Sequence, residues 1–210
     1  VVFKDGDRAG SAQECRSVDS LVIVSTEGRA FTVPIASLPD GRGMGAPLSS
    51  FVELGGGKIA HVLTGLPEDE LLIAKTSGYG FICTFGDLLS RQKAGKAFLT
   101  VEEGAGILPP VRLAGKDHLA ALSEDGRLLI FPLEQMKRLA SGKGVQIIGL
   151  RDAESLRAVI AMQGSRVMIK GTARNRVKTL ASEARHLALR ARRGLPVGPM
   201  TNVTLEAYPE

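Results

Sequence analysis

Short apolar runs separated by Gly, Asp and Pro occur along almost the whole chain. Runs of this length with turn residues between them predict β-strands joined as hairpins. The predicted hairpins join 21–24 with 30–33, 71–74 with 81–85, and 119–122 with 128–131. Gly28, Gly78 and Gly126 stand at the same place in the three turns. A glycine repeated in this way predicts a backbone position that needs positive φ.

The unit that contains each hairpin recurs about every fifty residues. Each hairpin is followed by a short amphipathic connector, at 35–38, 86–89 and 133–136. A cluster of glycine and basic residues comes next, at 41–45, 94–97 and 142–144, and then further strand-like runs at 51–54, 97–101 and 145–148. Four strands per unit is the simplest count. A period of this size is typical of a propeller-like array, in which neighbouring units bury each other's apolar faces.

A fourth, less regular unit completes the chain. Its predicted hairpin joins 159–162 with 166–170, and 192–194 would be its cluster. Residues 180–187 have helical propensity, although strand pairing can override it. The predicted organisation is one domain over residues 1–210, with approximate repeats 1–57, 58–106, 107–152 and 153–210. The first residues resemble a cut inside a larger protein, because they lack both an initiator Met and a signal-peptide pattern.

Composition and charge narrow the class of protein. No run of 18 apolar residues exists, so the sequence predicts no membrane span. Cys15 and Cys83 lie outside any disulfide or zinc spacing, and we expect two buried free thiols. Residues 1–150 carry a net charge of −1 and residues 151–210 a net charge of +6. A basic excess concentrated in one region favours a partner such as nucleic acid.

Motifs for catalysis are missing from the sequence. Lys143 lacks the glycine and hydroxyl neighbours of a phosphate-binding loop, and the three histidines are scattered. The carboxylate pairs stand beside turn residues, where nothing apolar would raise a pKa for acid–base work. Aromatic residues make up 4% of the chain, which argues against stacking on single-stranded bases. An enzymatic function therefore ranks last.

Basic residues at repeated positions remain as the candidate chemistry. Arg29 and Arg127 share one turn position, and other cations stand in or just before the clusters. Placed on successive blades, they would line one rim and follow a phosphate backbone. Charges that only keep a β array soluble are the alternative, and the cations after residue 151 favour DNA. The candidate DNA-binding residues are Arg29, Arg42, Arg91, Lys93, Lys96, Arg127, Lys137, Arg138, Lys143, Arg166, Lys170, Arg174, Arg176, Lys178, Arg190, Arg192 and Arg193.

Several of these segments resemble the C-terminal domain of the A subunit of bacterial topoisomerase IV. The resemblance is carried by 78–88 with Arg91 and 94–97, by 131–133 with 141–144, by 38–48, and by 192–194. It implies an all-β fold, a β-pinwheel of four-stranded blades with exchanged hairpins, which we expect to be open or truncated. In the related gyrase domain, a seven-residue box rich in glycine and arginine supports DNA wrapping. The clusters here match that box only in part, which favours the topoisomerase IV domain over the gyrase domain.

The resemblance also implies a function. We expect a non-catalytic domain that binds and bends duplex DNA and presents it to a catalytic core for decatenation and supercoil relaxation. A gyrase-type wrapping domain and a protein-interaction propeller are the alternatives. No cofactor is expected in this domain, since the family's ATP and Mg²⁺ act elsewhere. The implied partners are double-stranded DNA, the rest of the A subunit, and the B subunit, which is the ATPase. We expect the two subunits to form a heterotetramer that is cytoplasmic and associated with the nucleoid. Peripheral association of this holoenzyme with the membrane is a further possibility.

Overall fold

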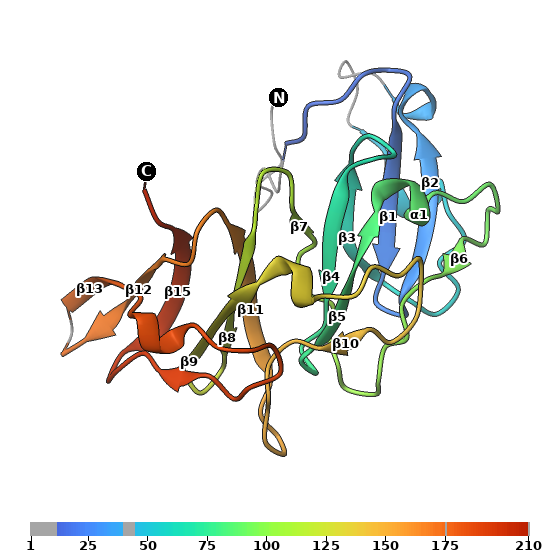
Figure 1. Cartoon of the computed structure of the whole chain (residues 1–210). Coiled ribbons are helices and arrows are strands. Elements are labelled where there is room, and N and C mark those ends of the chain that lie inside the picture. The colour runs from blue at the N-terminus through green and yellow to red at the C-terminus, as the bar shows by residue number, and fades with distance from the viewer. Residues whose placement is uncertain (1–11, 40–44, 175, 210) are drawn as a thin grey trace.

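A computed structural model describes residues 12–39, 45–174 and 176–209 as four antiparallel sheets in an open row (Figure 1). The first sheet has the order β3-β1-β2-β6, the second β10-β5-β4-β7, the third β11-β8-β9-β14, and the fourth β13-β12-β15. The first three sheets therefore have four strands and the fourth has three. We call these sheets blades 1 to 4. This architecture confirms the predicted all-β array of blades.

The predicted hairpins form the centres of the first three blades. They are β1 (Ser20–Ser25) with β2 (Arg29–Pro34), β4 (Glu70–Ala74) with β5 (Tyr79–Thr84), and β8 (His118–Ser123) with β9 (Arg127–Pro132). Gly28, Gly78 and Gly126 have φ of 75°, 82° and 72°, which confirms the predicted positive φ. Short helical connectors follow, namely η1 (Ile35–Ser37), α1 (Phe85–Leu88) and η3 (Leu133–Gln135).

Each of the first three blades takes one edge strand from the following repeat. These donated strands are β6 (Lys96–Ala97), β10 (Val145–Gln146) and β14 (Leu195–Pro196), which pair with β2, β5 and β9 respectively. A longer or later strand forms the opposite edge of each blade, and we call these the return strands. They are β3 (Ile59–Thr64), β7 (Val111–Arg112), β11 (Leu156–Met162) and β15 (Thr201–Ala207), of which the last three each follow a donated strand in the chain. Each of the first three blades therefore contains strands from two successive sequence repeats.

Apolar side chains fill the spaces between neighbouring blades. One cluster joins Val22 and Val24 of blade 1 to Phe81 and Phe85 of blade 2, and equivalent clusters lie between blades 2 and 3 and between blades 3 and 4. The donated strands contribute to these clusters, because Phe98, directly after β6, is 1% exposed. Blades hold each other through both the exchanged strand and the shared core.

The two ends of the row are finished differently. The outer apolar face of blade 1, which includes Phe31 and Val33, is covered by the blade's own loop through η2 (Leu48–Ser50) and Phe51. The outer side of blade 4 carries polar residues, among them Lys170 paired with Glu206.

The fourth hairpin differs from the one that the sequence predicted. Residues 159–162 lie in β11, which pairs with β8 of blade 3 and so completes that blade. The hairpin of blade 4 is instead β12 (Val167–Ala173) with β13 (Arg176–Ala181), so strand pairing overrides the helical propensity of 180–187. Only residues 184–186 are helical there, as the single turn η4 (Ala184–His186).

Two smaller expectations are also corrected. Residues 51–54 form bends and coil, because they cover the outer core of blade 1, and the return strand β3 begins later. Cys83 is buried as expected, whereas Cys15 is exposed because it precedes β1, the first strand of the described residues. Burial raises the pKa of the Cys83 thiol to about 12. None of the described helices is long and apolar enough to cross a membrane.

Candidate nucleic-acid interface

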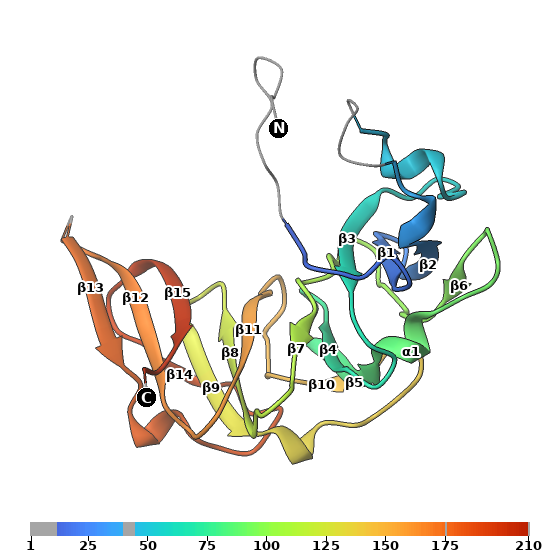
Figure 2. The same cartoon turned by 90° about the horizontal axis from the view of Figure 1, so that it is seen from above.

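The donated strands and the loops that lead to them lie along one outer edge of the row. Figure 2 shows the return strands β3, β7, β11 and β15 on the inner side, with β6, β10, β14 and β13 on the other side. Segments 91–97, 137–146 and 187–196 therefore share this edge, which we call the outer rim. Most of the candidate cations belong to these segments or to β13.

Eight candidate cations have neither a carboxylate, nor a hydrogen-bond acceptor, nor an aromatic ring as a side-chain partner among the described residues. Lys96 is half-buried and the other seven are exposed. The eight are Arg91, Lys93, Lys96, Lys137, Arg192, Arg174, Arg176 and Lys178. Each of the three donated loops contributes at least one of them, and the hairpin of blade 4 contributes the remaining three. This spacing along the rim is the arrangement that a phosphate backbone could follow.

Arg29 and Arg127 hydrogen-bond to backbone carbonyls of the donated segments. The Arg29 guanidinium donates hydrogen bonds to the carbonyl oxygens of Ala94 (2.8 Å) and Gly95 (2.9 Å), in the loop that leads to β6. Arg127 donates in the same way to Gly194 O at 3.2 Å. Both side chains are half-buried and directed at backbone carbonyls, unlike the eight cations above.

Several other candidates are held by carboxylates or by backbone oxygens. Arg138 pairs with Glu70 at 2.7 Å, Arg193 with Glu154 at 2.7 Å, Lys143 with Glu102 at 3.4 Å, and Lys170 with Glu206 at 3.6 Å. Arg190 donates to the carbonyl oxygens of Gln135 and Gln146. Arg166 lies over the ring of Tyr208, with its guanidinium carbon 4.2 Å from the ring centroid. Arg42 lies outside the described residues.

Blade 2 carries a charged cluster that reasoning from the sequence missed. Lys75 is 0% exposed, and its ammonium donates to Thr100 O at 2.6 Å and to Glu102 Oε2 at 2.8 Å. Lys143 binds the same carboxylate and lies over Tyr79, 4.5 Å from the ring centroid. Partial burial acts to raise the pKa of Glu102, but the hydrogen bonds and charges of Lys75 and Lys143, together with a backbone hydrogen bond, outweigh it and the pKa falls to about 2.

A comparison of the repeats position by position could have found this cluster. Lys75 stands where Ser25 and Ser123 stand in blades 1 and 3, and both serine hydroxyls accept a hydrogen bond from a turn N–H. A lysine at a buried serine position needs a counter-charge nearby. Glu102 supplies it from the segment that follows β6.

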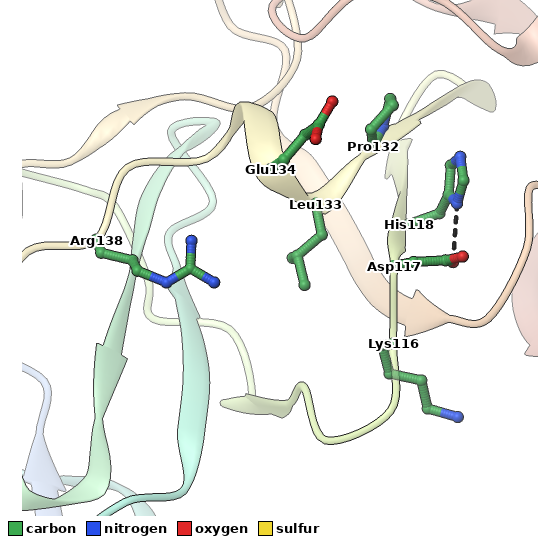
Figure 3. Close-up of a pocket in the computed structure, with 7 residues that line it drawn as sticks. All are labelled: Lys116, Asp117, His118, Pro132, Leu133, Glu134 and Arg138. Atoms are coloured by element: carbon green, nitrogen blue, oxygen red, sulfur yellow. Dashed lines mark hydrogen bonds and ion pairs between the residues drawn. The ribbon is translucent and has the colours of Figure 1, made fainter.

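The cavity drawn in Figure 3 contains one His–Asp pair. It is lined by Lys116, Asp117, His118, Pro132, Leu133, Glu134 and Arg138. His118 Nδ1 lies 2.8 Å from Asp117 Oδ1, and the bond from His118 is the main reason why the pKa of Asp117 is lowered. A carboxyl group with a lowered pKa is ionised at neutral pH and is a poor proton donor. No metal-binding group of His, Cys, Asp and Glu side chains occurs among the described residues.

Comparison with known proteins places this geometry in a family. The profile described as the DNA gyrase C-terminal domain, beta-propeller, matches residues 19–64 and 117–161, which contain the hairpins of blades 1 and 3. The structure of the E. coli ParC C-terminal domain superposes with a TM-score of 0.86 at 30% identity, covering 98% of this chain and 87% of that one. The chain belongs to the family of ParC-type topoisomerase IV C-terminal domains.

Relatives of this family agree along most of the chain. The A subunit of DNA topoisomerase 4 from Escherichia coli is 38% identical over 157 residues, and that from Neisseria gonorrhoeae is 36% identical over 184 residues. These matches cover 74% and 83% of this chain but 21% and 24% of the relatives, so the chain spans less than a quarter of their length. A DNA gyrase A C-terminal domain shares the fold, with a TM-score of 0.65 at 18% identity, covering 86% of this chain and 60% of that one.

Proposed function

We propose that this topoisomerase IV-type domain binds duplex DNA along its outer rim, bends it modestly and presents it to the catalytic core of a larger enzyme. The observation that carries the proposal is the recurrence, in three successive donated loops on one edge, of cations that have no carboxylate partner within the described part of the chain. A regular row of positive charge suits the phosphate backbone and carries no base-specific information. Binding should therefore depend strongly on salt and weakly on sequence.

Bending is the physical consequence of a curved contact surface. Smooth bending of a 20–30 bp site by 40–90° costs on the order of 1–6 kcal/mol. Neutralisation of several phosphates releases counterions, which can offset that cost at moderate salt. In this proposal the domain itself is non-catalytic. Decatenation, relaxation, ATP and Mg²⁺ belong to the holoenzyme, which includes the catalytic core and the ATPase subunit, at the nucleoid.

Two variants of equal charge test the proposal. The rim variant replaces Lys93, Lys137 and Arg192 with Gln, one from each donated loop. The control replaces Arg16, Arg112 and Arg157 with Gln, which are paired with Asp19, Asp69 and Glu124 and lie before β1 or on return strands. Affinity for a fluorescent duplex is measured between about 50 and 200 mM salt, the range over which such contacts are lost.

The rim variant should reduce the slope of log affinity against log salt by about 2.7, since each phosphate contact contributes about 0.9. The control should leave the slope within error of the unmodified chain. An equal reduction of the slope in both variants would mean that duplex binding depends only on the net charge of the chain. If neither variant changes duplex binding, a protein-interaction scaffold becomes the better explanation, and positive writhe in bound circular DNA would favour gyrase-type wrapping.

A further inference from the structure

The first residue of the second hairpin strand occupies the same register in each of the first three blades and faces the donated segment. Arg29 pairs with Ala97 of β6, Tyr79 with Gln146 of β10, and Arg127 with Pro196 of β14. In all three blades the side chain at this position contacts the donated segment.

Arg29 makes the most extensive of these contacts. Its Nε and Nη2 both donate to Ala94 O, at 3.1 and 2.8 Å, and Nη2 also donates to Gly95 O at 2.9 Å. A planar guanidinium can approach two adjacent carbonyls in this way because its donors are fixed as a fork. The contact joins residues that are 65 and 66 positions apart in the chain.

Blades 2 and 3 make the same junction with other atoms. Arg127 donates once, to Gly194 O at 3.2 Å. In blade 2 the hairpin residue is Tyr79, and the cation comes from the donated segment. Lys143 Nζ lies 4.5 Å from the centroid of the Tyr79 ring. Each of the three junctions therefore combines a cation with a carbonyl or an aromatic ring.

The donated strands need such support because their pairing is short. Each is two residues long and pairs with two residues of its acceptor. Few backbone hydrogen bonds hold them, among them Phe98 N to Gly28 O at 3.0 Å and Leu99 N to Gly28 O at 3.1 Å. Elements held by few hydrogen bonds open at lower free energy than the rest of a fold.

We infer that Arg29 and Arg127 are positioning residues that fasten the donated strands to the preceding blades, and that they bind no phosphate themselves. By fixing β6 and β14, they set where the rim cations of the adjoining loops stand, Lys93 and Arg192 among them. This role in fastening the blades is independent of DNA. Its effect on affinity rests on the proposed function.

Hydrogen–deuterium exchange of the whole chain tests the fastening directly. The variants are Arg29→Lys and Arg29→Gln, with Lys93→Gln as the control in the same loop. The amides of Phe98 and Leu99 should exchange about tenfold faster in both Arg29 variants. Loss of a charge-assisted hydrogen bond lowers the free energy of opening enough for a change of this size, and lysine cannot bind both carbonyls as the planar guanidinium does. The control should exchange as the unmodified chain does, and amides of β12 should be unchanged throughout, which shows that the variants are folded.

Duplex binding supplies the second readout. Arg29→Gln should weaken binding without changing the salt slope, whereas Lys93→Gln should reduce that slope by about 0.9. Unchanged exchange at Phe98 and Leu99 in Arg29→Lys, or a loss of slope in Arg29→Gln, would overturn the inference. Absence of duplex binding by the unmodified chain would refute the proposed function and leave the exchange result to decide the fastening role alone.

Discussion

Replacement of Glu102 by Gln is expected to destabilise the fold, because Glu102 supplies the negative charge opposite a fully buried ammonium. Lys75 is 0% exposed and its ammonium has two partners, the Glu102 carboxylate and Thr100 O. Gln preserves the shape of the side chain and removes the charge. Removal of one member of a buried ion pair typically costs about 3 kcal/mol or more.

The matched variants are Lys75→Met and the double variant. Lys75→Met leaves a carboxylate that is 33% exposed and partly hydrated, so it should cost less than Glu102→Gln. The double variant removes both charges and should lie within about 1 kcal/mol of Lys75→Met. The resulting coupling energy should be about 3 kcal/mol, which urea unfolding followed by far-UV circular dichroism can resolve if the slope m is unchanged.

The pH dependence of stability gives an independent check on the same pair. The pKa of Glu102 is lowered from 4.5 to about 2 in the folded protein, so its contribution is fully present above about pH 4.5. That contribution should disappear as the pH falls from about 4.5 to 2, and Glu102→Gln should lack this part of the acid sensitivity. Equal stability of Glu102→Gln and the unmodified chain at pH 7 would refute the claim that Lys75 is buried as a cation.

Two further predictions concern the junction and the thiols. Gly95→Ala should destabilise the chain by about 2 kcal/mol or more, because φ of Gly95 is 62° and a Cβ would lie 2.6 Å from Ala30 O. The control Gly115→Ala has a similar φ of 68° but no described atom within 4 Å, so it should cost only about 1 kcal/mol. Thermal or urea unfolding measures both. A thiol reagent should modify Cys15 at once and Cys83 only on unfolding, since Cys83 is buried with a pKa of about 12; rapid modification of both would contradict the burial.

The hairpins and their turns were predictable from sequence because they are local. The alternation of apolar runs and the glycines at 28, 78 and 126 determine them, and each hairpin spans 15 residues. The exchange of strands was not visible in the residues alone, since β6 pairs with β2 across more than sixty positions. The fourth hairpin was misassigned for the same reason, because β11 pairs with β8, which belongs to the preceding sequence repeat.

The candidate interface was predictable as a set of cations but not as a set of contacts. Arg29 and Lys93 are both basic residues near glycines in the sequence, and only the structure shows that Arg29 faces two carbonyls while Lys93 is exposed. Lys75 illustrates the opposite failure. It looked like an ordinary strand-end lysine, and its burial depends on Glu102, which lies 27 residues away.

The salt dependence of duplex binding by the unmodified chain tests the account most directly. Five cations without a side-chain partner among the described residues lie in the rim segments, and three more lie in the hairpin of blade 4. If all eight contact phosphates, the slope of log affinity against log salt can reach about −7, and contact with half of them gives about −3.6. The account predicts a slope in this range, equal for duplexes of unrelated sequence. A slope near zero, or binding confined to one sequence, would contradict it.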